Sequence, residues 1–405
     1  MVLTLAILRG HGNNLCAIER ARETRGEQRR AVVRRRRAVL AAAAGLAFAL
    51  GIAVAAGEGE DGGGRAAEPP VPPAQSPAPA QRADELPLTR QVGRLVVLRF
   101  AGTSAPGYVR EVLREGRAAG AILFRDNLVD PAQTEALTAQ LRRGAAGPPL
   151  ICVDQEGGEI RILPWAPPAR SQPEQAAAGA VRADALASAR ALRGAGVNVS
   201  LAPVADVASV PGAALAGRAF ATDFAAAARS VADAVRGWRE GRVAPTVKHF
   251  PGLGGATVNT DDGPATIARG AAQLREEDLA PFRAAIEAGV PLVMAGHAIY
   301  PAIDPERIAS QSVPVIDGLL REELGFDGVV ITDSTEAAAV QAVTGVEEAA
   351  VRNVRAGVDI VLTTGRGSYI QVYRALLAEA RRDPAFRARV RESAARVVAL
   401  QQSLR

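Results

Sequence analysis

The stretch Pro245-Thr246-Val247-Lys248-His249-Phe250 joins a β-branched run to an ammonium group and an imidazole. Such a short run of branched apolar residues is typical of a buried strand. Together with Pro245–Phe250, seven other segments of the same character make eight candidate strands. The seven are Leu95–Phe100, Ala119–Phe124, Pro149–Asp154, Val197–Ala202, Pro291–His297, Gly328–Asp333 and Asp359–Thr363.

Longer amphipathic and alanine-rich segments separate these candidate strands. The pattern predicts helices at Pro131–Arg142, Phe224–Glu240, Ala271–Ala288 and Thr335–Ala356, among others. Strands that alternate with helices indicate an α/β fold with parallel pairing. Eight such units in about 310 residues match a single-domain (β/α)8 TIM barrel in number and length. An open doubly wound sheet is the alternative, and the number of strands favours the closed barrel.

The N-terminal part has a different composition. Residues 1–37 hold ten arginines and three glutamates, so the total charge of +5 leaves −2 for the rest of the chain. A basic face for nucleic acid therefore has no support in the main domain. Four arginines, at 34–37, directly precede the apolar run 38–57, which predicts a cytoplasmic flank followed by a cleaved signal peptide or a retained membrane anchor.

Residues 58–88 are rich in glycine and proline and predict a semi-extended linker. We thus expect a folded domain over residues 89–405, which is exported and either anchored in the membrane or secreted. Because Cys152 is the only cysteine after residue 37, the exported part has no internal disulfide.

Polar residues follow the candidate strands at their C-terminal ends. They are Asp154, Asp206, Lys248, His249, His297 and Asp333. Catalytic groups of (β/α)8 barrels lie at this end of the ring. The group includes the only lysine among 48 basic side chains and both histidines that follow residue 37. Because lysine is a compact point donor and arginine a rigid fork, this position is expected to require an ammonium group.

Asp333 ends the run Val329-Val330-Ile331-Thr332 and brings a carboxylate to the mouth of the predicted barrel. Neither histidine has a partner at metal-ligand spacing, so we predict no metal site and no cofactor. Cleavage of glycosidic bonds needs a carboxylate nucleophile and a second acid/base group. Asp333 is therefore interpreted as a nucleophile or an acceptor for sugar hydroxyls, with a helix N-cap as the structural alternative.

Two loops carry further candidates. Asp154-Gln155-Glu156-Gly157-Gly158 offers carboxylates beside flexible backbone, which fits either a hydroxyl-binding edge or an acidic turn. The stretch from Pro251 to Gly263 is long and polar and follows Lys248 and His249 directly. Such a loop can supply a catalytic group to a rigid site, although Asn, Asp and Gly near its end also favour a simple turn.

Together these segments resemble the N-terminal barrel domain of family 3 glycoside hydrolases, and above all the single-domain bacterial β-N-acetylglucosaminidases. The resemblance covers roughly Leu95 to Leu400. It rests on seven motifs in the family's order: Gly120 to Asn127, Asp154 to Gly158, Ala202 to Val207, Gly217 to Phe220, Lys248 to Gly252, Val293 to His297 and Asp327 to Asp333.

The resemblance implies that Asp333 is the nucleophile that forms a covalent glycosyl-enzyme intermediate. It also implies that Asp154, Arg218, Lys248 and His249 bind the sugar. A further family arginine lies eight residues after the first Asp of the acidic run. Ile162 stands there in this chain, and Arg161, one residue earlier, is the candidate for that role.

The chain departs from the glucosaminidases in the loop after His249. Those enzymes carry an Asp-Ser-His triplet whose His is the acid/base and whose Asp orients it, whereas this chain has Asn259-Thr260-Asp261. Asp261 can donate the proton if desolvation raises its pKa. Asp262 and Glu156 are further candidates for this role.

These features predict an exported, retaining β-glycosidase that resembles β-N-acetylhexosaminidases and acts on amino-sugar glycans of the cell envelope or elsewhere. Its predicted partner is a carbohydrate substrate. If the N-terminal segment is not cleaved, that segment also binds the protein to the membrane. A degenerate barrel that binds cell-wall sugars without hydrolysis is the main alternative. A transferase or phosphorylase on the same scaffold is a third.

Overall fold

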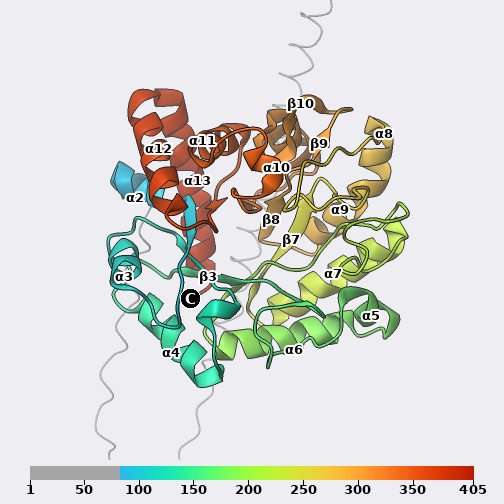
Figure 1. The fold of residues 1–405 in the computed structure, drawn as a ribbon, viewed down its shortest axis with the longest axis horizontal. Helices are drawn as coiled ribbons and strands as arrows, with labels where there is room; N and C mark the ends of the chain where they lie inside the picture. Colours follow the sequence, from blue (N-terminus) through green and yellow to red (C-terminus); the bar gives the residue numbers. More distant parts are fainter. Residues whose placement is uncertain (1–82) are drawn as a thin grey trace, which may run out of the picture. The chain divides into compact units, whose positions relative to one another are not determined.

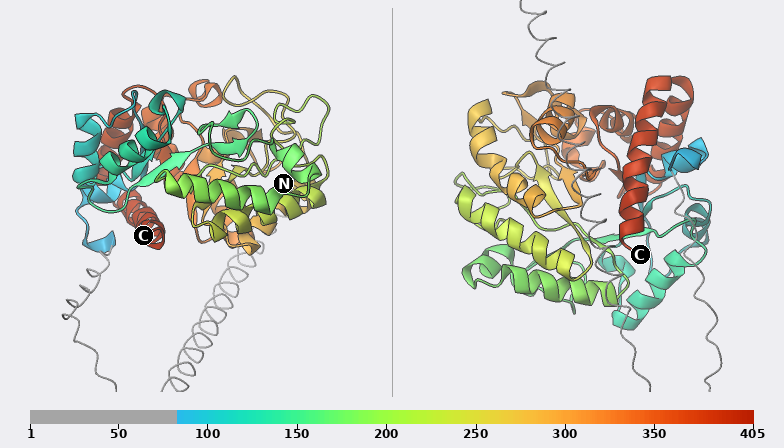
Figure 2. Two further views of the ribbon diagram at one scale, coloured as in Figure 1. Left: turned by 90° about the horizontal axis from the view of Figure 1, so that it is seen from below. Right: turned by 180° about the vertical axis from the view of Figure 1, so that it is seen from behind.

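The computed structural model describes residues 83–405, and its centre is a ring of parallel strands surrounded by helices (Figures 1 and 2). The sheet contains eight strands in the order β11-β8-β7-β6-β3-β2-β1-β12. They are β1 (Val96–Arg99), β2 (Gly120–Ile122), β3 (Leu150–Val153), β6 (Val199–Ser200), β7 (Ala244–Phe250), β8 (Leu292–Ala295), β11 (Val329–Thr332) and β12 (Val361–Leu362).

The first and last strands of this order meet and close the ring. Ile331 of β11 forms a parallel bridge with Ile360, which directly precedes β12. The Thr332 N–H donates to the Ile360 carbonyl over 2.9 Å, so backbone bonding continues around the barrel. All eight predicted strands are confirmed, and so is the (β/α)8 barrel in place of an open sheet.

A helix follows each strand and packs on the outside of the ring (Figure 1). In chain order these are α3 (Gly107–Arg114), α4 (Pro131–Arg142), α6 (Val181–Gly194), α7 (Phe224–Glu240), α9 (Ala280–Glu287), the π-helical η5 (Pro314–Glu323), α11 (Val346–Ala356) and α12 (Ser368–Arg382). Short α2 (Leu88–Gly93) precedes β1, α5 (Gln172–Ala177) precedes α6, and α13 (Pro384–Ser403) ends the chain.

The helix predictions hold in two cases and need correction in two. Pro131–Arg142 and Phe224–Glu240 are confirmed with the same bounds, and each begins after an aspartate whose side chain caps the first turn. The predicted helix 271–288 is divided into α8 (Ala271–Gln273), a π-helical turn and α9.

The single helix predicted over Thr335–Ala356 is wrong. It divides into α10 (Ala338–Gln341) and α11, which begins after Gly345. Thr335 stays outside the helix, where its backbone N–H and its hydroxyl both donate to the Leu362 carbonyl of β12.

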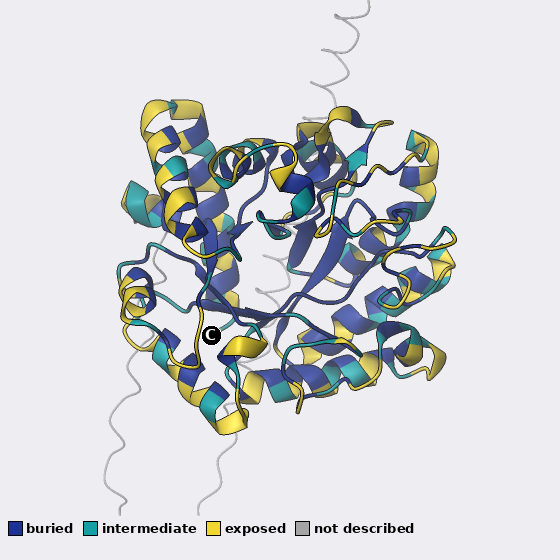
Figure 3. Cartoon of the chain, viewed as in Figure 1, coloured by how far each residue is buried: buried dark blue, intermediate teal, exposed yellow. Residues whose placement is uncertain are grey.

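Apolar side chains fill the ring from within and bind the helices from outside. Figure 3 shows the strands as almost wholly buried. Val97, Leu150, Met294 and other strand residues form an inner cluster, which Leu400 of α13 also joins. The Gln401 side chain donates to the Ala119 carbonyl at the start of β2, so α13 covers the N-terminal end of the barrel.

Two antiparallel hairpins extend the opposite rim. β4 (Gln155–Gly157) pairs with β5 (Ile160–Arg161) after β3, and β9 (Ile299–Tyr300) pairs with β10 (Asp304–Ile308) after β8. The segments assigned by sequence to residues 1–37 and 38–57, and most of the linker 58–88, lie outside the described residues. Within residues 83–405, no helix is both long and apolar enough to cross a membrane.

Candidate active site

The polar side chains at the C-terminal ends of the strands meet around one cavity of about 500 Å³. Asp154, Lys248, His249 and Asp333 all line it, as the strand-end rule predicts. Arg218, Asn259 and Asp261 reach it from loops. The volume lies within the range of small-molecule sites.

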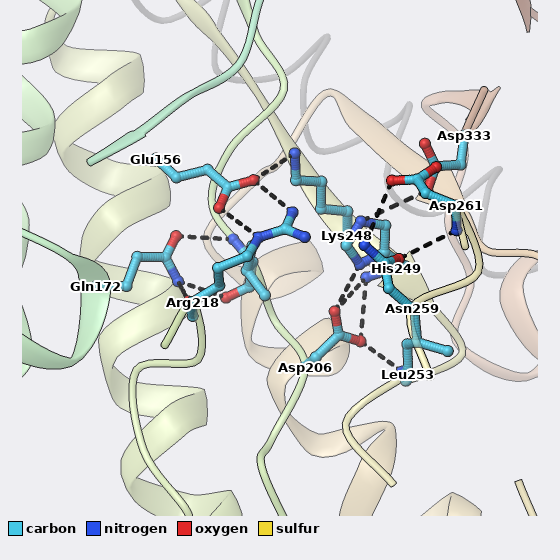
Figure 4. Close-up of polar contacts among 12 residues, drawn as sticks. Glu156, Gln172, Asp206, Arg218, Lys248, His249, Leu253, Asn259, Asp261 and Asp333 are labelled. Atoms are coloured by element: carbon cyan, nitrogen blue, oxygen red, sulfur yellow. Dashed lines mark hydrogen bonds and ion pairs between the residues drawn. The ribbon is translucent and has the colours of Figure 1, made fainter. Parts of the chain in front are cut away.

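Lys248 is the cation at the centre of this cluster (Figure 4). Its Nζ lies 2.6 Å from Asp154 Oδ1 and 2.7 Å from Glu156 Oε1, and only 3% of its side chain is exposed. Burial alone would lower the pKa of this ammonium group, but the carboxylates of Asp154 and Glu156 raise it overall. Lys248 is therefore charged, and its small head fits between two acceptors where a planar guanidinium would need more room.

Glu156 lies on β4 and joins Lys248 to Arg218. The guanidinium donates to both carboxylate oxygens, from Nε over 2.9 Å and from Nη2 over 2.7 Å. Burial favours the neutral acid, yet Lys248 and Arg218 outweigh it and lower the pKa of Glu156 to about 2. A carboxylate with this pKa stays ionised at neutral pH, so Glu156 is excluded as the proton donor and fixes two cations instead.

His249 is oriented by Asp206, which is fully buried. Asp206 Oδ2 lies 2.6 Å from His249 Nδ1, and Asp206 also accepts the backbone N–H groups of His249 and Leu253. Because both carboxylate oxygens of Asp206 accept backbone N–H groups, they act as acceptors toward the ring as well, so Nδ1 carries a proton. His249 Nε2 then faces Asp333 Oδ2 at 3.6 Å.

Asp333 follows β11 and is held by the backbone on both sides. Its N–H donates to the Ala295 carbonyl of β8, and its Oδ1 accepts the Ser334 N–H over 2.7 Å. Burial would raise the pKa of Asp333, but His249, Lys248 and the Ser334 N–H together lower it below its usual value. The carboxylate is thus ionised and rigidly placed, as a nucleophile requires.

His297 helps to hold Ser334, the residue that follows Asp333. It is fully buried, and burial lowers its pKa. Its Nε2 lies 3.0 Å from the Ser334 carbonyl, which can only accept, while Nδ1 lies 2.9 Å from the Ser310 hydroxyl. A neutral ring with the proton on Nε2 satisfies both contacts and fixes the residue next to Asp333.

Asp261 approaches the cavity from the loop after β7. Figure 4 shows its carboxyl beside that of Asp333. It is still accessible to solvent at the mouth, yet partial desolvation and the charge of Asp333 raise its pKa. Asn259 holds the loop locally, because its Oδ1 accepts the Asp261 N–H over 3.2 Å and its Nδ2 lies 3.5 Å from Asp261 Oδ2.

The loop is also anchored to the barrel. The carbonyls of Thr260 and Asp261 accept the N–H groups of Ala339 and Ala338 at the start of α10. Thr260 is fully buried. The segment after β11 therefore positions both carboxyls, Asp333 directly and Asp261 through the loop.

Two positions differ from the sequence prediction. Arg161 lies in β5, and its neighbours Ile160 and Ile162 line the cavity while Arg161 does not. Because successive residues of a strand face opposite sides, the one-residue offset turns Arg161 away. Arg99 lines the cavity and was not singled out from the sequence, although it is the polar residue at the end of the first strand.

Arg99 lies over the Phe124 ring, 5.0 Å from its centroid, and pairs with Asp126 at 3.1 Å. Asp262 is exposed and does not line the cavity. Over residues 83–405, no group of three or more His, Cys, Asp and Glu side chains is placed to hold a metal ion.

Comparison with known proteins identifies the family. The sequence profile of the glycosyl hydrolase family 3 N-terminal domain matches residues 88–400. The chain belongs to glycosyl hydrolase family 3. The match spans the whole barrel and includes every rim residue described above.

Relatives within family 3 agree with this assignment. A β-hexosaminidase of Stenotrophomonas maltophilia is 37% identical over 279 residues, which cover 66% of this chain and 82% of that protein. The structure of a family 3 β-N-acetylglucosaminidase from Paenibacillus sp. matches with a TM-score of 0.74 and 36% identity, over 79% of this chain and 63% of that one. The chain thus spans less than two thirds of the Paenibacillus enzyme.

A β-N-acetylhexosaminidase from Beutenbergia cavernae has a similar structure, with a TM-score of 0.70 and 32% identity, over 78% of this chain and 99% of that chain. Family membership and these relatives make the protein a glycoside hydrolase whose substrate is a carbohydrate.

Proposed function

We propose that the protein is a retaining β-N-acetylhexosaminidase in which Asp333 is the nucleophile and Asp261 the acid/base. One observation carries the proposal: two neighbouring carboxyls in one cavity have pKa values shifted in opposite directions. The pKa of Asp333 is lowered and that of Asp261 is raised. Opposite shifts of this kind are the pattern by which one carboxylate attacks and the other donates a proton.

In the first step Asp333 attacks the anomeric carbon and forms a glycosyl ester, while the proton of Asp261 passes to the departing oxygen. In the second step Asp261 accepts a proton from water, which displaces Asp333 and restores both groups. Asn259 contacts both the backbone N–H and the carboxyl group of Asp261 and thereby orients this acid.

The rest of the cavity supports sugar binding. Asp154, Lys248 and Arg218 present acceptors and donors for hydroxyl groups from one side. Ile122, Leu201, Met294 and Leu362 line the cavity from inside the barrel, where they suit apolar parts of a sugar such as ring C–H groups or an acetamido methyl. The β-hexosaminidase relatives support N-acetylated substrates over plain glucosides.

The first test is hydrolysis of 4-nitrophenyl β-N-acetylglucosaminide and 4-nitrophenyl β-glucoside by the purified, folded chain. We expect turnover with the first substrate, release of the β-anomer in ¹H NMR and little turnover with the second. Saturable binding of N-acetylglucosamine without turnover of either substrate would favour the sugar-binding alternative and contradict the proposal.

The Asp261→Asn variant tests the acid/base directly. We expect kcat/KM to fall about 10²- to 10⁴-fold for a disaccharide leaving group, which needs protonation, and far less for 2,4-dinitrophenolate, which does not. Because Asp261 must be protonated, wild-type activity should fall as pH rises through its raised pKa, and this basic limb should disappear in the variant. On the acidic side, activity falls as Asp333 becomes protonated below its usual pKa range.

The matched control is Asp262→Asn, since Asp262 is the exposed neighbour that does not line the cavity. Equal losses for good and poor leaving groups in Asp261→Asn, or a larger loss in Asp262→Asn, would remove Asp261 from the proposed role.

We further propose that the enzyme acts outside the cytoplasmic membrane. The support is the charge pattern of the N-terminal part, where four arginines precede an apolar run at 38–57 and a proline-rich linker follows. Protease treatment of intact cells should degrade an anchored enzyme, and a secreted one should appear in the medium. Full protection inside intact cells would contradict export.

A further inference from the structure

A second cavity lies at the end of the barrel opposite the active site. Its volume is about 440 Å³, and it lies against the start of β7 and Pro291, which precedes β8. Four arginines line it, and no acidic side chain of the described residues does: Arg193, Arg239, Arg242 and Arg405. We call this cavity the arginine basin. The C-terminus, marked in Figure 2, lies at this end of the barrel.

Two guanidinium groups of the basin contact backbone carbonyls. Arg239 Nη1 donates to the Ala288 carbonyl over 2.7 Å, and Arg193 Nη1 lies 3.5 Å from the Arg242 carbonyl. Among residues 83–405, no carboxylate forms an ion pair with Arg193, Arg239 or Arg242. Like charges gathered around one cavity repel each other, and an anion from solution would relieve that repulsion.

The backbone of Arg242 shows that this arrangement has a conformational cost. Arg242 has φ of +60° and is the only non-glycine residue with positive φ in the described part of the chain. It follows the end of α7, where Val243 N–H donates back to the Trp238 carbonyl. Left-handed backbone at this point of a helix end strongly favours glycine.

Other helix ends of the same barrel follow that preference. After α6, α9 and α11 the same backbone hydrogen bond forms, and the left-handed residue is Gly196, Gly289 or Gly357. Only α7 has an arginine there, although Gly241 directly precedes it. General attraction between cations and helix C-termini does not explain this choice, because an arginine in the last turn would satisfy it without strain. Strain of this kind persists mainly where function requires the side chain.

The cavity thus combines arginines that have no acidic side-chain partner among the described residues with a residue kept in an unfavourable conformation. Planar guanidinium groups pair best with oxyanions, through two parallel hydrogen bonds.

We propose that the arginine basin binds a phosphate-type oxyanion with two or more negative charges, as a second ligand site remote from the catalytic cavity. This site does not depend on the proposed hydrolase mechanism. The basin is larger than a single phosphate group needs, so the anion is free pyrophosphate or the phosphate group of a longer chain.

The test compares melting temperatures of the full chain in sodium chloride, phosphate, pyrophosphate and polyphosphate at equal ionic strength. We expect pyrophosphate at 100 times its dissociation constant to raise Tm by several degrees beyond chloride, because it binds only the folded state. A rise with polyphosphate alone identifies a phosphate chain as the ligand, and a rise with pyrophosphate identifies the free ion. No rise beyond chloride with any of the three would overturn the proposal.

Arg242→Gly separates binding from folding. Relief of the left-handed arginine should raise Tm in chloride by about 2 °C, while the additional rise with pyrophosphate should shrink by more than half. A purely structural arginine would give the first change and leave the second intact, which would overturn the proposal. Arg239→Gln should also reduce the pyrophosphate effect, and Arg236→Ala is the control, since Arg236 is exposed on α7 and pairs with Asp233 instead of lining the basin.

Discussion

The two ends of the barrel differ in whether their positively charged side chains are paired with carboxylates. At the rim, Lys248 contacts two carboxylates and Arg218 pairs with one of them in bidentate fashion. At the other end, three of the basin arginines have no acidic partner among the described residues. A set of matched charges leaves polar donors and acceptors with little net charge, which suits a neutral sugar. The unpaired positive charges of the basin favour the binding of an anion.

The difference also appears in rigidity. Glu156 and Lys248 are almost completely buried, with exposed side-chain fractions of 2% and 3%, whereas the basin arginines are exposed. Buried pairs hold fixed geometry because separation of the partners leaves a charge without compensation. The rim is thus built to place reacting atoms, and the basin only to attract a charged group.

The strongest test of the rim removes the nucleophile. We expect Asp333→Asn to lower kcat/KM at least about 10³-fold, because the neutral amide cannot form the glycosyl ester. The folded state should be retained, which circular dichroism can verify. The matched control is Asp327→Asn, because Asp327 is exposed, precedes the same strand at its other end and does not line the cavity.

If Asp333→Asn kept a tenth of the wild-type activity, the rim would hold sugar by matched charges without a nucleophile, and the contrast between the two ends would concern binding alone. A covalent intermediate trapped with a 2-fluoro sugar on Asp333 of the wild-type enzyme, detected by peptide mass spectrometry, would instead show directly that Asp333 is the nucleophile.

A second test uses acid to break the matched charges. Because the pKa of Glu156 falls to about 2 on folding, its carboxylate contributes stability that is fully present above its ordinary pKa of 4.5 and is lost as pH falls toward 2. Glu156→Gln should therefore lower the free energy of unfolding by about 3 kcal/mol at pH 7. Urea unfolding at several pH values should show the difference from wild type narrowing below pH 4.5.

Glu159→Gln is the control for this experiment, since Glu159 is exposed on the same hairpin. The Glu156 ion pairs would not stabilise the fold if the difference in free energy of unfolding between wild type and Glu156→Gln stayed constant down to pH 3. An equal loss of unfolding free energy in Glu159→Gln would lead to the same conclusion. No acidic side chain of the described residues lines the basin, so Arg239→Gln should show no such pH dependence.

The contrast between the ends also shows what the sequence can and cannot predict. Strand register in a parallel barrel fixes which residues reach the rim, so Asp154, Lys248 and Asp333 were found from their places at strand ends. The positions of Arg218 and Asp261 came from family resemblance, because a loop has no periodicity that would place them. Arg161 does not line the cavity, because it lies one residue from positions that do and neighbouring residues of a hairpin strand face opposite sides.

The arginine basin could not be predicted from the sequence, for another reason. It forms where the ends of α6, α7 and α13 meet, and their separation along the chain exceeds anything that local pattern encodes. Because the chain has 47 arginines, the presence of three or four of them at helix ends does not by itself indicate a site. Only the left-handed backbone of Arg242, a property of the fold, distinguishes it from the others.

The smallest expected effect comes from Lys248→Arg, which preserves charge and alters shape. Nζ of Lys248 lies between acceptors at 2.6 and 2.7 Å, and a guanidinium is wider and planar, so it must displace Asp154 or Glu156. A displacement of about 1 Å near the reacting atoms can lower kcat/KM by up to about 100-fold, and we expect a loss of 10- to 100-fold. The reciprocal exchange, Arg193→Lys in the open basin, should leave hydrolysis unchanged because that end of the barrel does not contact the sugar. If Lys248→Arg kept full activity, the rim would require charge alone, as the basin does, and the retention of a single lysine in this chain would have no physical explanation.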